Sequence, residues 1–214
     1  MFKNRKDAGI QLGIALKKFK KENPIVIGIP RGGIETAFYV AKELNAEMIP
    51  VISRKLGFPH NPELAMGAIA EDGSIFLSSF AKANVTEDRI EEIKNWEKEE
   101  IKRRINLLRG GKPLPSFKNR TVIVVDDGIA TGATLFATLE LCKKQNPKKL
   151  IIAAPVSGRE AAERLSTMAD AVIILETPLD FYAVSQVYES FSNLSDEATI
   201  DLVHKFEEEK SKMN

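Results

Sequence analysis

Residues 122–134 read VIVVDDGIATGAT, and this stretch decides the fold that the sequence predicts. Its first four residues are apolar and β-branched, which is typical of a strand buried on both faces of a sheet. The strand ends at two carboxylates, Asp126 and Asp127, and a polar turn with two glycines follows at once. A helix is expected over 133–145, so the segment predicts a buried strand, a tight turn and a helix.

The turn has the chemistry of an anion site next to a pair of acids. Its backbone N–H groups and the hydroxyls of Thr131 and Thr134 lie where a helix begins, and a helix N-terminus favours negative charge. The two carboxylates at the strand end suit the hydroxyls of a ribose. A ligand with a ribose and a 5′-phosphate would contact Asp126, Asp127, Gly128, Ile129, Ala130, Thr131, Gly132, Ala133 and Thr134. The alternative is an ordinary strand, turn and helix in which the acids only cap the turn.

Composition describes a globular protein of one domain. The 214 residues are 43% apolar and 29% charged, enough for a single sizeable core. With 31 basic and 30 acidic residues the net charge is +1, which argues against a nucleic-acid partner. No apolar run reaches membrane-spanning length and the N-terminus lacks the apolar core of a signal peptide, so we expect a cytoplasmic protein without a membrane partner. The single cysteine, Cys142, is expected to be a buried thiol.

Strand and helix patterns alternate along most of the chain. We expect helices over 5–20, 34–44, 133–145 and 159–167, and strands over 25–29, 48–53, 122–126, 149–154 and 171–175. This alternation predicts an α/β fold, a mainly parallel twisted sheet with helices on both faces, as a single domain over 1–214. Ligands of such folds bind at the C-terminal ends of the strands, where the loops described here are expected to lie.

Two segments break the alternation. Residues 54–72 are rich in Gly, Pro and Asn without a clear period, and they are expected to form a long loop that acts as a flexible lid. Residues 86–109 predict a charged helical insertion with Thr86 as N-cap and a narrow apolar stripe, which would pack on the body or on a second subunit. The stripe consists of Ile90, Ile93, Ile101, Ile105 and Leu108. The basic cluster 102–104 is better explained as a solvated helix end than as a nucleic-acid contact.

A second glycine loop reads GIPRGG over residues 28–33 and lies between a strand and a helix. Gly32 and Gly33 allow backbone N–H groups to approach an anion, and Arg31 offers a bidentate donor. A plain tight turn has the same appearance when this loop is considered alone. Two anion loops flanking a carboxylate pair, however, suit 5-phosphoribosyl 1-pyrophosphate (PRPP), which has a 5′-phosphate at one end and a pyrophosphate at the other.

The chain resembles the type I phosphoribosyltransferases over most of its length. Residues 122–134 resemble their PRPP motif, and 30–33 resemble their pyrophosphate loop. The string RKLGFP at 54–59 is similar to the Arg-Lys opening of the lid in adenine phosphoribosyltransferases, and 54–70 resembles an uncharacterised bacterial and archaeal branch of predicted phosphoribosyltransferases. Residues 177–184, TPLDFYAV, resemble the hood of 6-oxopurine enzymes, so we define a hood over 176–195.

The resemblance implies that Phe181 and Ala183 lie at the base, with Phe181 stacking on it; a core aromatic beneath a loop is the alternative for Phe181. Two departures leave the acceptor open. Ala130 stands where 6-oxopurine enzymes have an aspartate that exchanges a proton with the purine. Their base-reading lysine also has no counterpart in the strand near 151–156, and Arg159 is the nearest cation.

The activity implied is transfer of the phosphoribosyl group from PRPP to a nitrogenous acceptor, a nucleobase above all, with release of pyrophosphate. Arg31, Arg54 and Lys55 would neutralise the pyrophosphate, and Asp126 and Asp127 would hold the ribose. Mg²⁺ would arrive bound to PRPP and would not be held by the protein alone, with Asp126 and Asp127 as candidate protein ligands. The two histidines, His60 and His204, are not expected to be catalytic. The alternatives are a non-catalytic regulatory protein that senses PRPP or nucleotides, and a protein acting on another ribose phosphate. The resemblance also leaves room for a homodimer.

Overall fold

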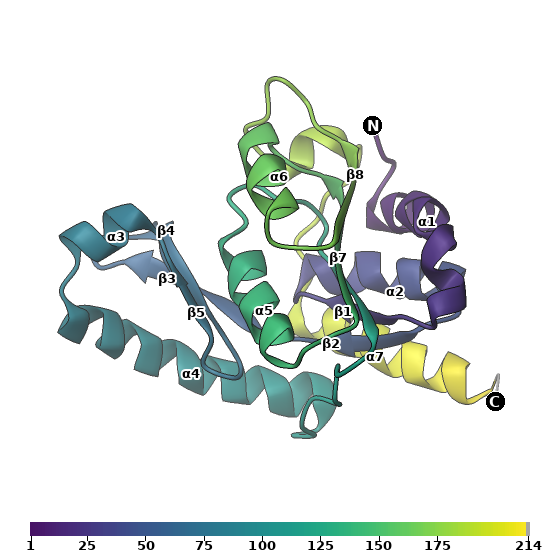
Figure 1. The fold of residues 1–214 in the computed structure, drawn as a ribbon, viewed down its shortest axis with the longest axis horizontal. Coiled ribbons are helices and arrows are strands. Elements are labelled where there is room, and N and C mark those ends of the chain that lie inside the picture. Colours follow the sequence, from purple (N-terminus) through teal and green to yellow (C-terminus); the bar gives the residue numbers. More distant parts are fainter. Residues whose placement is uncertain (213–214) are drawn as a thin grey trace.

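The computed structural model describes residues 1–212, whose centre is a five-stranded parallel sheet with helices on both faces (Figure 1). Across the sheet the strands are β2 Glu47–Pro50, β1 Ile25–Gly28, β6 Thr121–Val125, β7 Lys149–Val156 and β8 Ala171–Glu176. All four neighbouring pairs are parallel. The predicted fold class is therefore confirmed, and the C-terminal ends of all five strands meet at one edge.

The alternation of side chains along the strands separates two apolar cores. Val26 and Ile123 face one core, and their neighbours Ile25 and Val122 face the other. The first core is covered by α1 Arg5–Ala15, α2 Gly32–Leu44 and α7 Asp196–Ser211, and the second by α5 Ala133–Lys144 and α6 Arg159–Ser166. Because both faces are covered, every residue of β6 is buried, as the apolar run predicts.

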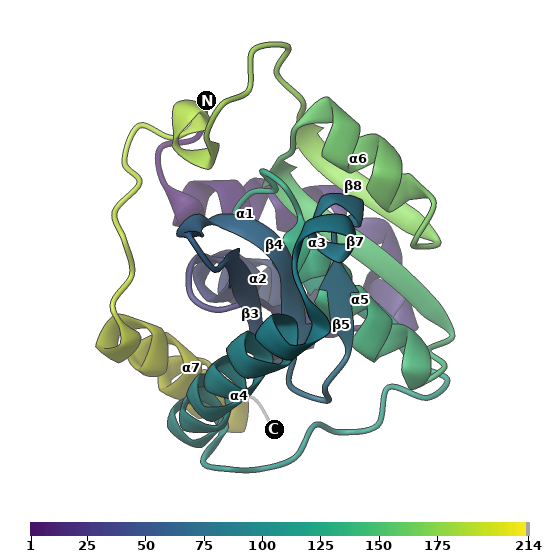
Figure 2. The same cartoon turned by 90° about the vertical axis from the view of Figure 1, so that its left-hand side faces the viewer.

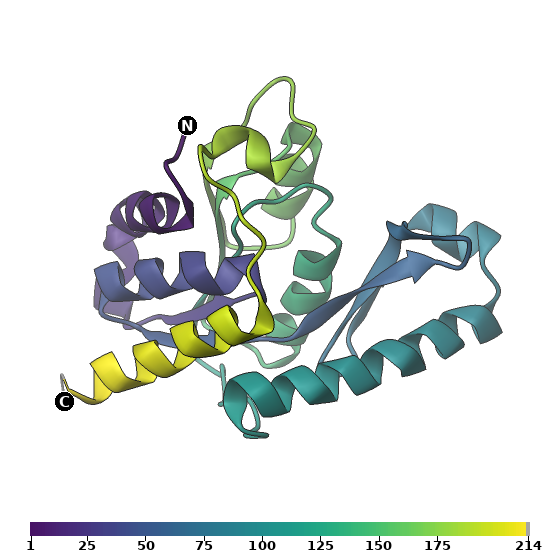
Figure 3. The same cartoon turned by 180° about the vertical axis from the view of Figure 1, so that it is seen from behind.

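An arm formed by residues 53–109 projects from the sheet (Figures 1 and 3) and is seen end on in Figure 2. It contains an antiparallel sheet of β3 Ser53–Phe58, β4 Asn61–Ala70 and β5 Ile75–Leu77, followed by α3 Ser79–Asn84 and α4 Glu87–Arg109. The expected long loop at 54–72 is therefore wrong, because most of that segment is the β3–β4 hairpin. The elements of the arm nevertheless belong to the same two apolar cores as the sheet.

The glycines that suggested a loop serve close strand packing instead. A Cβ atom on Gly67 would lie 2.1 Å from the carbonyl oxygen of Phe76 on β5. A Cβ on Gly57 would lie 2.6 Å from the carbonyl oxygen of Pro62, beside a register shift of the hairpin. A side chain is therefore excluded at both positions by the backbone of the neighbouring strand. The residues adjacent in sequence do not reveal this close contact.

The charged insertion is a helix, as predicted. In α4, Ile90, Ile101 and Leu108 are buried and face β3, β4 and α7, so the stripe packs on the body of the same chain. Thr86 occupies the N-cap position, although its side chain makes no capping hydrogen bond. The cations of the basic cluster pair with acids one turn away, and the fork of Arg103 on Glu100 lowers the pKa of that carboxyl to about 2. Lys102 and Arg103 are exposed, as expected for a solvated helix surface. Arg104 is largely buried, however, and Arg103 also donates to Asp196 of α7.

A buried ion pair fastens the base of the arm to the sheet. Arg109, at the end of α4, donates from Nη1 and Nη2 to the two carboxylate oxygens of Glu71, at 2.9 and 2.5 Å. Arg109 Nη1 also donates to the carbonyl oxygen of Pro50, and Glu71 accepts from the backbone N–H of Ile52. Both side chains are less than a tenth exposed, so the two ends of the arm meet at one desolvated point.

Smaller differences from the predicted elements concern helix and strand ends. The first helix ends at Ala15 and continues as a 3-10 helix, Lys17–Glu22, where a single helix to residue 20 was expected. The hood begins where β8 ends and holds one short 3-10 helix, Val184–Val187. Cys142 is buried in α5 as predicted, and burial raises the pKa of its thiol. Within residues 1–212, no helix has the length and apolar character needed to cross a membrane.

Candidate functional site

The two glycine loops lie side by side because their strands are neighbours. Gly28 at the end of β1 is in register with Val125 at the end of β6. The chain then enters the 30–33 loop after one strand and the 126–134 loop after the other. The last residues of these loops are already the first turns of α2 and α5, which begin at Gly32 and Ala133. The prediction that both loops share one edge of the sheet is therefore confirmed, and two helix N-termini, each favourable to an anion, open at this edge.

The 126–134 loop lines an open cavity of about 190 Å³, which we call the phosphate cavity. It is lined by Lys55, Ala65, Asp126, Gly128, Ile129, Ala130, Thr131, Gly132, Ala133 and Thr134. Gly132, the N-cap of α5, has φ +73°, a left-handed conformation that favours glycine. Ile129 differs from its neighbours, because its N–H donates to the carbonyl oxygen of Val156 and its side chain is buried, so it anchors the loop.

Asp126 lies between the two loops. Its Oδ1 accepts the backbone N–H of Asp127 at 2.9 Å, and a Cβ on Gly33 would lie 2.8 Å from that same oxygen. Removal from water, together with the charge of Asp127, raises the pKa of Asp126 well above its ordinary value. A carboxylate in this position is available to a ligand that spans the phosphate cavity and the 30–33 loop.

Asp127 has a different environment from Asp126. Its Oδ2 is 2.6 Å from Nε of Arg5, a residue of α1 that is 6% exposed. A Cβ on Gly32 would lie 1.8 Å from the same Oδ2, so only glycine fits against this carboxylate. The backbone carbonyl of Asp127 accepts a hydrogen bond from the Tyr188 hydroxyl at 2.6 Å. Asp127 is thus held at both its side chain and its backbone.

Arg5 was not identified from the sequence, although one signal was present. Arg5, Ala8 and Leu12 are all buried on one face of α1, at helical spacing. A cation in line with an apolar stripe is rarely buried unless it is paired. The periodicity could therefore have marked Arg5, but it could not have named Asp127 as the partner, which is 122 residues away.

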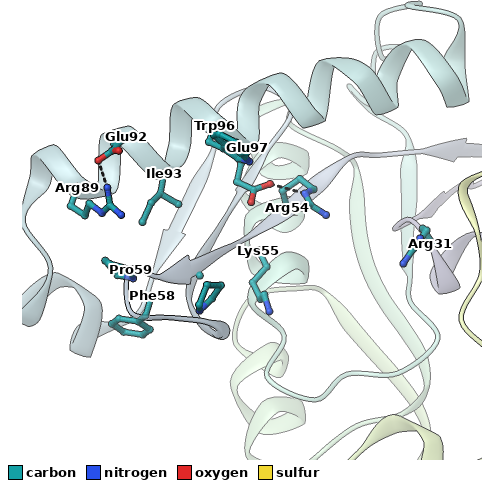
Figure 4. A pocket seen from close by; sticks show the side chains of 12 residues that line it. Arg31, Arg54, Lys55, Phe58, Pro59, Arg89, Glu92, Ile93, Trp96 and Glu97 are labelled. Atoms are coloured by element: carbon teal, nitrogen blue, oxygen red, sulfur yellow. Dashed lines mark hydrogen bonds and ion pairs between the residues drawn. The ribbon is translucent and has the colours of Figure 1, made fainter.

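The lid residues Arg54 and Lys55 point in different directions (Figure 4). Because consecutive residues of a strand face opposite sides, Arg54 faces α4 and Lys55 faces the 126–134 loop. Arg54 Nε donates to Glu97 Oε2 on α4 at 2.8 Å. Lys55 lines the phosphate cavity together with Asp126. Of the two cations, it is therefore Lys55 that the hairpin brings to the 126–134 loop.

A larger cavity of about 710 Å³, the arm cavity, lies between the hairpin and α4 (Figure 4). Its wall includes Arg31, Arg54 and Lys55, so the three cations predicted to meet a pyrophosphate share one cavity. The remaining lining residues are Gly57, Phe58, Pro59, Pro62, Arg89, Glu92, Ile93, Trp96 and Glu97. Arg31 is half-exposed at the entrance to α2, and its Nη1 is 3.7 Å from Oδ1 of Asp196.

The hood lies directly against the 126–134 loop. A Cβ on Gly128 would lie 2.3 Å from Cγ1 of Val184, and one on Gly158 would lie 3.2 Å from Cδ1 of Phe181. Phe181 is half-buried and Ala183 is exposed. The ring of Phe181 therefore has a surface packed on the strand end and a surface that is open, which is compatible with both of its predicted roles.

Comparison with known proteins gives the assignment. The phosphoribosyl transferase domain family matches residues 10–190, which include both glycine loops, the arm and most of the hood. The chain belongs to the phosphoribosyltransferase family. Two Mycobacterium tuberculosis proteins described as candidate phosphoribosyl transferases are 36% identical over 210 residues, which is 96% of this chain and 47% of theirs. The chain spans about half the length of these curated relatives.

A solved structure shares the whole architecture of this phosphoribosyltransferase family member. The crystal structure of TT1426 from Thermus thermophilus superposes with a TM-score of 0.82 at 35% identity, covering 96% of this chain and 99% of that one. At this similarity the arm and the hood belong to the shared fold.

The acid pair of this family member fits a divalent cation only when a ligand supplies further oxygens. Among residues 1–212, no group of three or more His, Cys, Asp or Glu side chains is placed to hold a metal ion. Asp126 lines the phosphate cavity, whereas Oδ2 of Asp127 is occupied by Arg5. Mg²⁺ prefers phosphate oxygens and water over an all-protein cage, so the donor set suits a cation that arrives with a polyphosphate.

Proposed function

We propose that this family member transfers the 5-phosphoribosyl group from PRPP to a nitrogenous acceptor, a nucleobase in the first instance, and releases pyrophosphate. The observation that carries the proposal is the pair of glycine loops at neighbouring strand ends with Asp126 between them. A ligand with phosphates at both ends and a diol in the middle matches that order of groups.

The 5′-phosphate is assigned to the phosphate cavity, at the N-terminus of α5. There the backbone N–H groups of the turn and the hydroxyls of Thr131 and Thr134 would surround it. The pyrophosphate is assigned to the 31–33 loop, with Arg31 and Lys55 as cations. Asp126 then faces the ribose, which lies between the two phosphate positions.

Catalysis in this arrangement consists of stabilising separated charges. The bond between C1 of the ribose and the pyrophosphate oxygen breaks, the leaving group keeps the electron pair, and the acceptor nitrogen forms the new bond to C1. Positive charge develops on the ribose as in glycoside cleavage, and Asp126 lies where a negative charge would stabilise it. Mg²⁺, when bound with PRPP, would supply charge neutralisation of the pyrophosphate, and Asp126 is its candidate protein ligand. Since position 130 is alanine, the acceptor's proton would pass to solvent or to a group of the substrate.

The proposal is tested first by titrating the protein with PRPP and MgCl₂ in a calorimeter. Saturable binding is expected, and its absence would overturn the PRPP assignment. Pyrophosphate release is then measured with adenine, hypoxanthine, guanine, xanthine, uracil and orotate in turn. Release that depends on one base would name the acceptor, whereas binding without turnover on any base would favour a PRPP-sensing regulatory protein.

The two lid cations are expected to differ in their effect on turnover. Lys55→Ala should lower kcat/KM for PRPP by about 100-fold, because Lys55 lines the phosphate cavity as well as the arm cavity. Arg54→Ala should cost only about 10-fold, because Arg54 lines the arm cavity but not the phosphate cavity. Steady-state rates at varied PRPP measure both values.

A matched control for the lid comparison is Arg89→Ala. Arg89 lines the outer part of the arm cavity and pairs with Glu92 on the same helix. The cations of the arm cavity could act only through their summed electrostatic field, without a direct contact to the substrate. In that case kcat/KM for PRPP will fall by the same factor in all three alanine variants. That result would contradict a specific contact for Lys55.

A further inference from the structure

We infer that Arg5 is a positioning residue for the ribose site: it holds Asp127, and through Asp127 the neighbouring Asp126, in the orientation that meets the ribose. This inference rests on the proposed function and makes it more specific, because it names the residue that orients the acid pair. It also gives the start of α1 a role in a site that is otherwise built from strand ends.

The contacts of Arg5 are those of a cation fixed in one orientation. Its Nε donates to Asp127 Oδ2 at 2.6 Å, and its Nη1 donates to the backbone carbonyl of Ser192 at 2.7 Å. The guanidinium lies over the ring of Phe191, 3.9 Å from the ring centre. At 6% exposure the side chain has left water, so these partners replace its hydration.

Asp127 is correspondingly held by the protein at one carboxylate oxygen and at its backbone carbonyl. Its Oδ2 is occupied by Arg5 and flanked by Gly32, and its carbonyl oxygen is occupied by the Tyr188 hydroxyl. Asp126 has its carboxylate beside Gly33 and lines the phosphate cavity. The backbone N–H of Asp127 donates to Asp126, so a fixed Asp127 also fixes the carboxylate that faces the ligand.

The same guanidinium reaches the hood. Ser192 and Phe191 belong to the hood, and Tyr188 of the hood packs on Phe191 with ring centres 4.9 Å apart. Arg5 therefore joins three parts of the molecule: α1, the acid pair and the segment expected over the acceptor. Loss of Arg5 should loosen the orientation of Asp126 and of the hood together.

The test is a double-mutant cycle on the full chain, with PRPP and MgCl₂ as the probe and the dissociation constant as the readout. We expect Arg5→Met to weaken PRPP binding about 10-fold and Asp127→Asn about 10-fold, and the double variant also about 10-fold, since both act through one contact. Asp126→Asn should weaken binding by about 100-fold or more. Arg5→Lys, which keeps the charge, should recover part of the loss.

Folding is controlled in the same experiment. Arg5→Met leaves the Asp127 carboxylate buried without its cation, which destabilises the folded protein. The double variant Arg5→Met and Asp127→Asn has no such unpaired charge, so it should stay folded and its PRPP binding can be measured. Arg120→Met, at the opposite end of β6, is the matched surface control. Thermal midpoints are recorded for each variant, and binding is measured at a temperature at which all are folded.

The outcomes separate the inference from the proposed function. If wild-type protein does not bind PRPP, the proposed function has failed. If wild type binds, the inference is overturned when Arg5→Met lowers only the thermal midpoint, or when the two single losses multiply to about 100-fold in the double variant.

Discussion

Replacing Asp126 by asparagine is expected to lower kcat/KM with PRPP by about 100- to 1,000-fold. The substitution removes the negative charge that faces the ribose between the two glycine loops, and it leaves the size of the side chain unchanged. The amide oxygen of asparagine retains the acceptor for the Asp127 N–H. Steady-state rates with the acceptor that supports turnover, or PRPP binding by calorimetry, measure the loss.

The same substitution is not expected to destabilise the protein. Burial and the charge of Asp127 disfavour the ionised form of Asp126, and for this reason its pKa is raised. A neutral asparagine side chain removes the free-energy cost of burying that charge. The thermal midpoint should therefore stay the same or rise. Asp201→Asn on the exposed surface of α7 serves as the control, and wild-type PRPP affinity in the Asp126 variant would refute the role given to this carboxylate.

Arg109→Met is expected to reduce the free energy of unfolding by about 3–5 kcal/mol. Arg109 and Glu71 are both nearly buried and share two hydrogen bonds, so removal of the cation leaves a buried carboxylate without its counter-ion. For a domain of this size the loss corresponds to a decrease of roughly 6–20 °C in Tm. Chemical denaturation followed by circular dichroism measures the free energy directly.

Two further variants isolate the buried charge as the cause. Adding Glu71→Gln to Arg109→Met removes the unpaired carboxylate while keeping an acceptor for the Ile52 N–H, so the double variant should be more stable than Arg109→Met. Lys143→Met breaks an exposed pair with Glu140 and should change stability by less than about 0.5 kcal/mol. Equal losses at the buried and exposed pairs would contradict the importance of desolvation at Arg109.

The sheet and both glycine loops were predictable because their signals are local. A run of β-branched residues such as 122–125 has few alternatives to a buried strand, and glycines at the start of a helix indicate a close approach of the backbone. The charged helix 86–109 was equally readable from its N-terminal threonine and its stripe. In each case the residues that decide the structure lie within one element and the turn beside it.

The arm hairpin and the partner of Arg5 were not predictable, because their causes lie far away in sequence. Gly67 is required by a carbonyl on the next strand, so its meaning depends on strand pairing. Arg54 and Lys55 look like one basic pair in the sequence, and they are separated only once they alternate along a strand. Arg5 and Asp127 meet because α1 and the end of β6 are brought together by the whole fold.

The buried ion pair at the base of the arm also has a mechanical consequence. Helix α4 has 23 residues and is therefore about 35 Å long, and Arg109 lies at its sheet end. A rod of that length pivoting by about 10° around Arg109 moves its far end through an arc of about 6 Å. Glu97 lies part-way along this rod and holds Arg54, so small rotations at the pivot would translate the hairpin and its cations across the mouth of the site.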